Sequence, residues 1–186
     1  MGTETTRKLF TVDEYYRMAG AVILQDDVRT ELIEGEILEM SAMGSLHAAV
    51  VSLINETFVH LFKGQAQVRS QLPIRLDMFS EPQPDIALVR PAKDFYKSQH
   101  PQPSEVLLIV EISDSSLAYD LGIKMPLYAA AGIPEVWIAD LTNDVLFVFR
   151  NPSGKSYLNA ITVHRNDSVH CLAFPETIIL AEQILR

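Results

Sequence analysis

The sequence predicts a mixed α/β (α+β) fold: a helix, a three-stranded antiparallel meander, a second helix and a strand parallel to the meander. Two observations lead to this prediction. Residues 105–140 read as an apolar strand, a polar turn, a helix, a glycine turn and another apolar strand, and such a unit implies a right-handed crossover between parallel strands. Further strand-sized apolar runs precede and follow this unit, so antiparallel strands are expected on both sides.

Size and composition are those of one globular domain over residues 1–186. The chain is 48% hydrophobic and 21% charged, and a chain of this length can bury a substantial core. No apolar run approaches the ~20 residues that cross a bilayer, and the first ten residues lack the apolar stretch of a secretory signal. The lone Cys171 excludes an internal disulfide. These features predict a cytoplasmic protein.

The distribution of charge bears on the partners. The formal net charge is −9, whereas a non-specific nucleic-acid binder normally carries a basic stripe. This acidic balance argues against nucleic-acid binding without excluding it, because a bound metal ion offsets local negative charge. Lys124 is the only lysine or arginine between Lys97 and Arg150. An acidic span around one lysine is the composition of a divalent-metal pocket, although acids on solvated loops would give the same composition.

The N-terminal part predicts a short helix and a hairpin. Thr11 and Glu14 have the spacing of a capping box, which starts a helix through about Ala19. Residues 30–40 read as two strands around the Glu34-Gly35 turn. Most of the acidic side chains of this hairpin are expected to be solvated.

Residues 45–62 predict the first long helix. Ser45 is its expected N-cap, and Lys63-Gly64 ends it. One narrow apolar stripe on this helix consists of His47, Val51, Ile54, Phe58 and Leu61. His47 lies at the N-terminal end of the stripe, where packing is its commoner role and contact with a functional site is the alternative.

The next segments predict two strands and a loop. Residues 66–76 alternate polar and apolar side chains, with Pro73 indicating an edge strand, and residues 84–90 form a strand that opens with Pro84-Asp85. Residues 91–104 form a polar, proline-rich loop that is functional or mobile. Its candidates for a phosphate-contacting patch are Lys93, Lys97 and His100, and a solvated surface loop is the alternative.

The strand–helix–strand unit follows. Residues 105–113 are apolar almost throughout, so both faces of this strand should be covered. Lys124 falls within the inward stripe of the helix, together with Leu117, Leu121, Tyr128 and Ala131. Pro126 predicts either a kink or a helix that begins close to this residue. Gly132 ends the helix, and residues 135–140 form the next buried strand.

The C-terminal part reads as antiparallel additions. Residues 145–150, 157–165 and 168–174 predict a meander, with one turn at residues 151–154 and another at Asn166-Asp167. A short helix is expected from about residue 177 to 185. His164 and His170 lie on different strands without metal-ligand spacing and are expected to be structural.

Three charged residues predict the chemistry. Asp85 and Glu111 stand at the ends of adjacent strands, where two carboxylates can bind Mg²⁺ (or Mn²⁺), and the carbonyl of Ile112 can add an oxygen. Lys124, with Asp120 one turn before it, can orient or deprotonate an attacking water and stabilise charge on a phosphate. The alternative is an internal salt bridge that only locks helix to strand.

A set of motifs then points to a family. The segments PDI (84–86), VEIS (110–113), Asp120 with Lys124 and Tyr128, AGIPEVWIAD (131–140), TELIEGEI (30–37) and SLH (45–47) resemble the Uma-type putative restriction endonucleases. That family is one branch of the PD-(D/E)XK nuclease superfamily. The resemblance covers nearly the whole chain.

The resemblance implies a restriction-endonuclease-like core with an extra N-terminal hairpin and C-terminal antiparallel strands. It implies that Asp85 and Glu111 are metal ligands and that Glu111 begins the acid-x-Lys element. Ser113 occupies the position of the superfamily lysine, and Lys124 resembles its migrated equivalent. Glu31 and His47 match family-like positions that could reach the pocket.

The expected function is therefore a Mg²⁺-dependent endonuclease that hydrolyses DNA. Cutting both strands of a duplex favours a homodimer. Two alternatives remain: a binding or regulatory protein that keeps the nuclease scaffold without turnover, and a metal hydrolase of a smaller phosphate ester.

Overall fold

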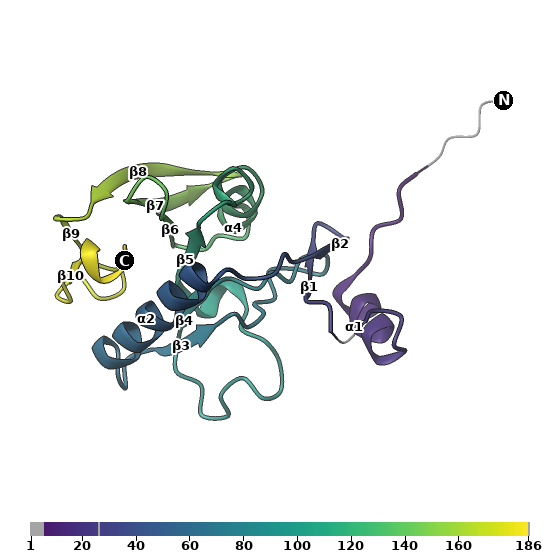
Figure 1. Ribbon diagram of the computed structural model, residues 1–186. Helices are drawn as coiled ribbons and strands as arrows, with labels where there is room; N and C mark the ends of the chain where they lie inside the picture. Colours follow the sequence, from purple (N-terminus) through teal and green to yellow (C-terminus); the bar gives the residue numbers. More distant parts are fainter. Residues whose placement is uncertain (1–5, 26, 186) are drawn as a thin grey trace.

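A six-stranded mixed sheet forms the centre of the computed structural model, which describes residues 6–25 and 27–185 (Figure 1). Its strands, in spatial order, are β3 (Gln67–Ser70), β4 (Ile86–Val89), β5 (Val106–Ser113), β6 (Glu135–Asp140), β7 (Val145–Ser153) and β8 (Ser156–His164). Strands β5 and β6 are parallel, and all other neighbours are antiparallel. The predicted meander and parallel crossover are confirmed.

Helices cover the two faces of this sheet. Helix α2 (Ser45–Leu61) packs against one face, where Leu88 and Val110 join its core. The crossover helix packs against the other face, where Val89 and Ile109 join a second core. Successive side chains of a strand point to opposite faces, so the nearly continuous apolar runs of β4 and β5 supply both cores.

The crossover helix contains a π-helical segment. It runs as α3 (Leu117–Tyr119), η2 (Asp120–Lys124) and α4 (Met125–Ala130), and η2 has π geometry. Pro126 lies directly after η2, near the start of α4, where a missing backbone N–H is best tolerated. The chain therefore accommodates this proline by widening the preceding turn, and the helix continues on both sides of it.

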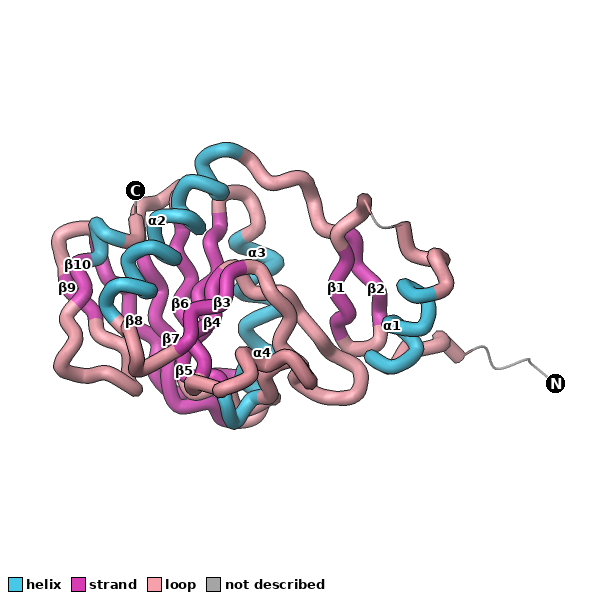
Figure 2. Tube along the Cα trace, turned by 90° about the horizontal axis from the view of Figure 1, so that it is seen from below, coloured by secondary structure: helices cyan, strands magenta, loops and turns pink. Residues whose placement is uncertain are grey.

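The N-terminal part lies beside the sheet. Helix α1 (Val12–Gly20) begins with the predicted capping box, and β1 (Thr30–Ile33) pairs with β2 (Glu36–Glu39) in the predicted hairpin. Figure 2 shows α1 and this hairpin next to one another, on the side of the molecule away from β8. Gly35 in the turn has φ +82°, and a Cβ there would lie 2.7 Å from Leu9 Cβ. Only glycine fits this position.

Two expected boundaries differ in the first half of the chain. The N-cap of α2 is Gly44, and Ser45 is the first helical residue without a side-chain cap. Strand β3 ends at Ser70 instead of continuing to residue 76. Gln71 has φ +53°, which takes the chain out of extended geometry before Pro73 is reached.

The C-terminal prediction was partly wrong. Strand β7 continues through residues 151–153, so the hairpin turn is at Gly154-Lys155. Residues 168–174 do not add a strand to the main sheet, because β9 (Ser168–Val169) pairs with β10 (Ile179–Leu180) in a separate two-stranded sheet. The expected terminal helix is replaced by β10 and a short 3₁₀ turn, η3 (Ala181–Gln183).

Strand β8 is an edge of the main sheet with little protection. In the described part of the chain it pairs only with β7. Its middle is uncovered, since Leu158 is 74% exposed and Ile161 is 49% exposed. The strand carries no charged residue and no proline from Ser156 to Val163. The opposite edge strand, β3, is only four residues long and carries Arg69.

The C-terminal segment is fixed to the sheet by one buried carboxylate. Glu135 is fully buried and accepts hydrogen bonds from Trp137 Nε1 (2.9 Å), Arg150 Nε (2.7 Å) and the Leu172 backbone N–H (2.6 Å). Arg150 also donates to the carbonyl of His170. Cys171, between these two anchored residues, is fully buried, and burial raises the pKa of its thiol.

No helix in residues 6–25 and 27–185 is long and apolar enough to cross a membrane.

Arg150→Ala should destabilise the protein by about 3 kcal/mol, because it leaves the buried Glu135 carboxylate without its cationic partner. The free energy of unfolding from denaturant titration measures this loss. Arg165→Ala is the matched control, because Arg165 forms an exposed ion pair with Asp144 and such pairs contribute little. Equal effects of the two substitutions would show that Glu135 does not depend on Arg150.

Candidate active site

A cavity of about 510 Å³ opens where the C-terminal end of β5, the N-terminus of α2, the β1–β2 hairpin and the crossover helix meet. It is lined by all the residues predicted for the site: Glu31, His47, Asp85, Glu111, Ile112, Asp120 and Lys124. These residues come from segments that are distant in the sequence. The structure therefore brings the predicted set together in one place.

Asp85 and Glu111 are neighbours because of the strand register. Ile86 of β4 pairs with Val110 of β5, so the next pair along is Asp85 and Glu111. The Asp85 backbone N–H donates to Glu111 Oε2 (3.3 Å), and the Ile112 N–H donates to Asp85 Oδ2 (2.9 Å). The Glu111 carboxylate is thus bonded to the backbone of Asp85, and the Asp85 carboxylate to the backbone of Ile112, the residue after Glu111.

The second oxygen of Asp85 is held from α2 and from the end of β3. His47 Nε2 lies 2.8 Å from Asp85 Oδ1, and the Gln71 side-chain amide donates to the same oxygen (3.2 Å). Burial alone would raise the pKa of Asp85, but the bonds from His47, Ile112 and Gln71 hold it below its usual value. The hydrogen bond to Asp85 in turn raises the pKa of His47. His47 therefore belongs to the cavity and not only to the packed stripe.

Lys124 lies at the centre of the buried charges. Its side chain reaches inward from η2, is only 6% exposed, and places Nζ 3.2 Å from Glu111 Oε1 and 3.8 Å from Glu31 Oε2. Burial alone would lower the pKa of Lys124, but the surrounding carboxylates raise it. The ammonium is therefore held in its charged form.

Glu111 is the most deeply buried acid of the site. Burial raises its pKa above the usual value, and the neighbouring Lys124 ammonium opposes this rise by favouring the charged carboxylate. The hydroxyl of Tyr128, on α4, donates to Glu111 Oε1 at 2.6 Å. Lys124 and Tyr128 both contact this oxygen, and these two contacts hold the crossover helix against β5.

Asp120 lines the cavity and is bonded to two serine hydroxyls. Its Oδ2 accepts hydrogen bonds from Ser113 Oγ and Ser116 Oγ, both at 2.6 Å. It forms no ion pair with Lys124 in the described structure. Ser113 thus connects the end of β5 to the start of the helix. Asp120 lines the cavity as an anchor for this connection.

Several cavity-lining residues were not predicted as site residues, among them Gln71, Tyr119 and Arg29. Gln71 contacts Asp85 because its positive φ turns the chain at the end of β3. Tyr119 donates to Glu31 Oε1 (3.2 Å), and Arg29 lies at the rim. Tyr128 lies behind the cavity wall, bonded to Glu111, and was not predicted as a site residue either, although it shared the predicted stripe with Lys124 four residues away. That spacing is the one sequence signal that could have found any of them.

Arg29 is the cavity's one arginine, and it contacts neutral partners. Its guanidinium donates to Gln83 Oε1 (3.2 Å) and makes a long contact with Gln71 Oε1 (3.5 Å). Arg29 and Gln71 both line the cavity. The loop residues suggested as a phosphate-contacting patch, Lys93, Lys97 and His100, do not line the cavity.

The donor set fits a hydrated hard cation. Among the residues that the structure describes, no three His, Cys, Asp or Glu side chains converge as a ready-made metal cage. Asp85, Glu111 and Ile112 all line the cavity, and Mg²⁺ is usually bound by one or two carboxylates while it keeps several waters. Buried acids also outnumber the bases here, so a divalent cation would offset the excess negative charge.

Comparison with known proteins supplies a family and a fold. The family model "Uma2: Putative restriction endonuclease" matches residues 12–182. No curated protein matches this chain significantly. A solved structure, a putative nuclease belonging to DUF820 from Anabaena variabilis ATCC 29413, is similar with a TM-score of 0.73 and 17% identity. The match covers 95% of this chain and 97% of the other, and at this identity the likeness shows the fold alone.

Tyr128→Phe should lower the free energy of unfolding by about 2 kcal/mol, because it removes a buried hydrogen bond to a carboxylate. Tyr157→Phe is the control, since Tyr157 donates to the neutral carbonyl of Ile133 and should cost only about 1 kcal/mol. Denaturant titration of both variants provides the comparison. A loss in Tyr128→Phe no larger than in Tyr157→Phe would contradict a special role for the bond to Glu111.

Proposed function

This chain belongs to the Uma2 putative restriction endonuclease family, and we propose that it is a divalent-metal-dependent endonuclease that hydrolyses DNA phosphodiester bonds. One observation carries the proposal. Asp85, Glu111 and Lys124 converge at the wall of an open cavity. They come from three elements: Asp85 directly precedes β4, Glu111 is in β5, and Lys124 is in η2 of the crossover helix. Fold alone would not fix the reaction, whereas this cluster of charged side chains supports hydrolysis.

Asp85, Glu111 and the carbonyl of Ile112 would hold the cation. A bound Mg²⁺ or Mn²⁺ would act as a Lewis acid on a phosphate oxygen and activate water. The chain itself supplies the orientation of the ligands. Backbone N–H groups and the side chains of His47 and Gln71 hold Asp85, while Tyr128 and Lys124 hold Glu111.

Lys124 acts next to the reacting phosphate. Its ammonium is fixed by Glu111 and Glu31, so it carries little rotational freedom that binding would have to remove. A charged donor placed in advance stabilises negative charge that builds on the phosphate and orients the attacking water. Glu31 is thereby a positioning residue for Lys124.

Substitution of the three residues should abolish metal-dependent cleavage. Asp85→Asn, Glu111→Gln and Lys124→Met should each lower the rate of DNA cleavage in Mg²⁺ by about 10²-fold or more, because each removes charge that acts on the transition state. Gel analysis of plasmid DNA gives the rate, and circular dichroism confirms folding. Glu56→Gln and Lys63→Met, two exposed positions, are the controls. Cleavage that survives in all three site variants would refute the assignment.

Arg29 is placed to bind a phosphate at the mouth of the cavity, because guanidinium groups bind phosphate oxygens in a bidentate manner. Arg29→Ala should weaken DNA binding about 10-fold, a loss of one charge-assisted contact, and Arg29→Lys should restore only part of it. Fluorescence anisotropy with labelled DNA measures both. Arg17→Ala, an exposed arginine of α1, is the control. If Arg17→Ala weakens binding as much as Arg29→Ala does, Arg29 contributes only non-specific positive charge to DNA binding.

A binding or regulatory protein without turnover is the second candidate. The observation that favours it is the full set of protein partners around the carboxylates: each oxygen of Asp85 and Glu111 already accepts a hydrogen bond. A calorimetric titration with Mn²⁺ separates the two candidates. Binding that disappears in Asp85→Asn supports the metal-dependent nuclease, and absence of binding to the unsubstituted protein favours the silent scaffold. Hydrolysis of a generic phosphodiester without DNA binding would instead indicate a smaller phosphate ester as substrate.

A further inference from the structure

A projecting loop stands outside the cavity. We call residues 93–97, at the tip of the loop between β4 and β5, the knob. Tyr96 anchors it: this side chain is buried, its hydroxyl donates to the carbonyl of Arg90 (2.7 Å), and Arg69 lies over its ring at 5.6 Å. Asp94 accepts from the Tyr96 N–H (3.3 Å) and from Ser98 Oγ (3.2 Å). The loop is thus folded around its own contacts.

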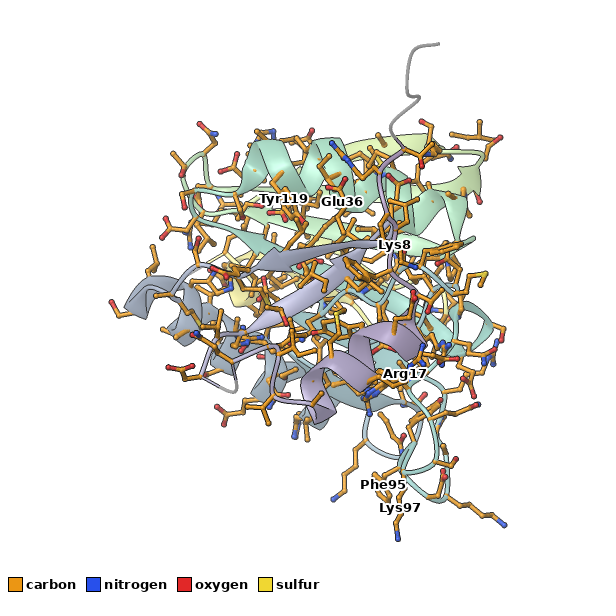
Figure 3. All side chains as sticks on the ribbon, turned by 90° about the vertical axis from the view of Figure 1, so that its right-hand side faces the viewer. Lys8, Arg17, Glu36, Phe95, Lys97 and Tyr119 are labelled. Carbon is orange, nitrogen blue, oxygen red and sulfur yellow. The ribbon has the colours of Figure 1, made fainter. Side chains whose placement is uncertain are left out.

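The knob presents an aromatic ring to solvent. Phe95 is 75% exposed, and Figure 3 shows Phe95 and Lys97 at the outer end of the loop. Phe95 and Tyr96 have φ +55° and +58°, a conformation that bulky residues rarely adopt and that costs about 1–3 kcal/mol each. The fold thus keeps the Phe95 ring in solvent on a strained backbone.

Two lysines flank the exposed ring. Lys93 and Lys97 are both exposed, and within the described residues neither forms an ion pair, since the only acid of the knob, Asp94, faces the Tyr96 backbone and Ser98. The chain as a whole carries a net charge of −9. A cationic tip around an aromatic ring matches the two chemical groups of a nucleic-acid strand, its phosphates and its bases.

We propose that the knob binds an unpaired stretch of DNA, with a base stacked on Phe95 and phosphates on Lys93 and Lys97. This inference rests on the proposed nuclease function and names where the part of the substrate outside the cavity binds. Stacking on a single exposed ring tolerates any base, because every base has a π-face. The knob therefore adds affinity without sequence preference.

The position of the knob sets a length requirement. The cavity lies at the N-terminal end of β4, next to Asp85, and the knob follows the C-terminal end of the same strand. Four residues of strand span roughly 13 Å, so only a strand of several nucleotides reaches both places. A small phosphodiester can enter the cavity without contacting the knob.

Anisotropy titrations of the full chain with labelled single-stranded DNA of about 16 nucleotides test the proposal. Without added metal, Phe95→Ala should weaken binding about 5- to 100-fold, the loss of one stacked base. Leu158→Ala is the matched control, because Leu158 is 74% exposed and lies on β8, four strands away from β4 in the sheet. Lys93→Met and Lys97→Met should each reduce the slope of log affinity against log salt by ~0.7, unlike Lys63→Met.

Hydrolysis of bis(p-nitrophenyl) phosphate in Mn²⁺ keeps this test separate from the proposed function. The knob variants should hydrolyse it at the unsubstituted rate, whereas Asp85→Asn should not hydrolyse it. If even the unsubstituted protein fails to hydrolyse it, the proposed function fails, while the binding titrations still decide the role of the knob. Equal losses in Phe95→Ala and Leu158→Ala, or unchanged salt slopes in both lysine variants, would overturn the proposal. Equal losses of single-stranded and duplex binding in Phe95→Ala would overturn the stacking of an unpaired base.

Discussion

Burial of the Glu111 carboxylate is the constraint on which the rest of the site depends. A charge removed from water must be paired, because an unpaired buried ion costs far more than packing returns. Glu111 meets this requirement with Lys124 and Tyr128 from the crossover helix, and Glu31 of the hairpin approaches the same ammonium. Three separate elements of the fold are therefore fixed around one carboxylate, and the cavity forms where they meet.

The core of the fold could be predicted because its signals are long. Strands β4, β5 and β6 are apolar almost throughout, and a strand buried on both faces needs no tertiary information to be found. The C-terminal segment has no such signal. Residues 177–185 are apolar enough for a helix, but the chain there is tied down by β9 and by the contact of Leu172 with Glu135. Short segments take the conformation that such tertiary contacts allow.

The same distinction holds for the candidate site. Asp85, Glu111 and Lys124 could be predicted because strand ends and a helical stripe place them. Gln71 and Arg29 could not, because their positions follow from a left-handed residue and from contacts between separate segments. The π segment was also missed. It carries Asp120 and Lys124, both buried, just before the proline-containing start of α4, and such segments are often found at functional sites.

The unprotected edge strand β8 has a consequence for the colloidal behaviour of the protein. An edge without charge or proline is a template on which a strand of another molecule can pair, and Leu158 and Ile161 would then be shielded from water. Since β8 itself carries no repelling charge, mutual repulsion must come from the net charge of −9 elsewhere on the surface. Solubility should therefore be lowest near the pI of about 4.9, where this long-range repulsion vanishes and no longer opposes intermolecular strand pairing at β8.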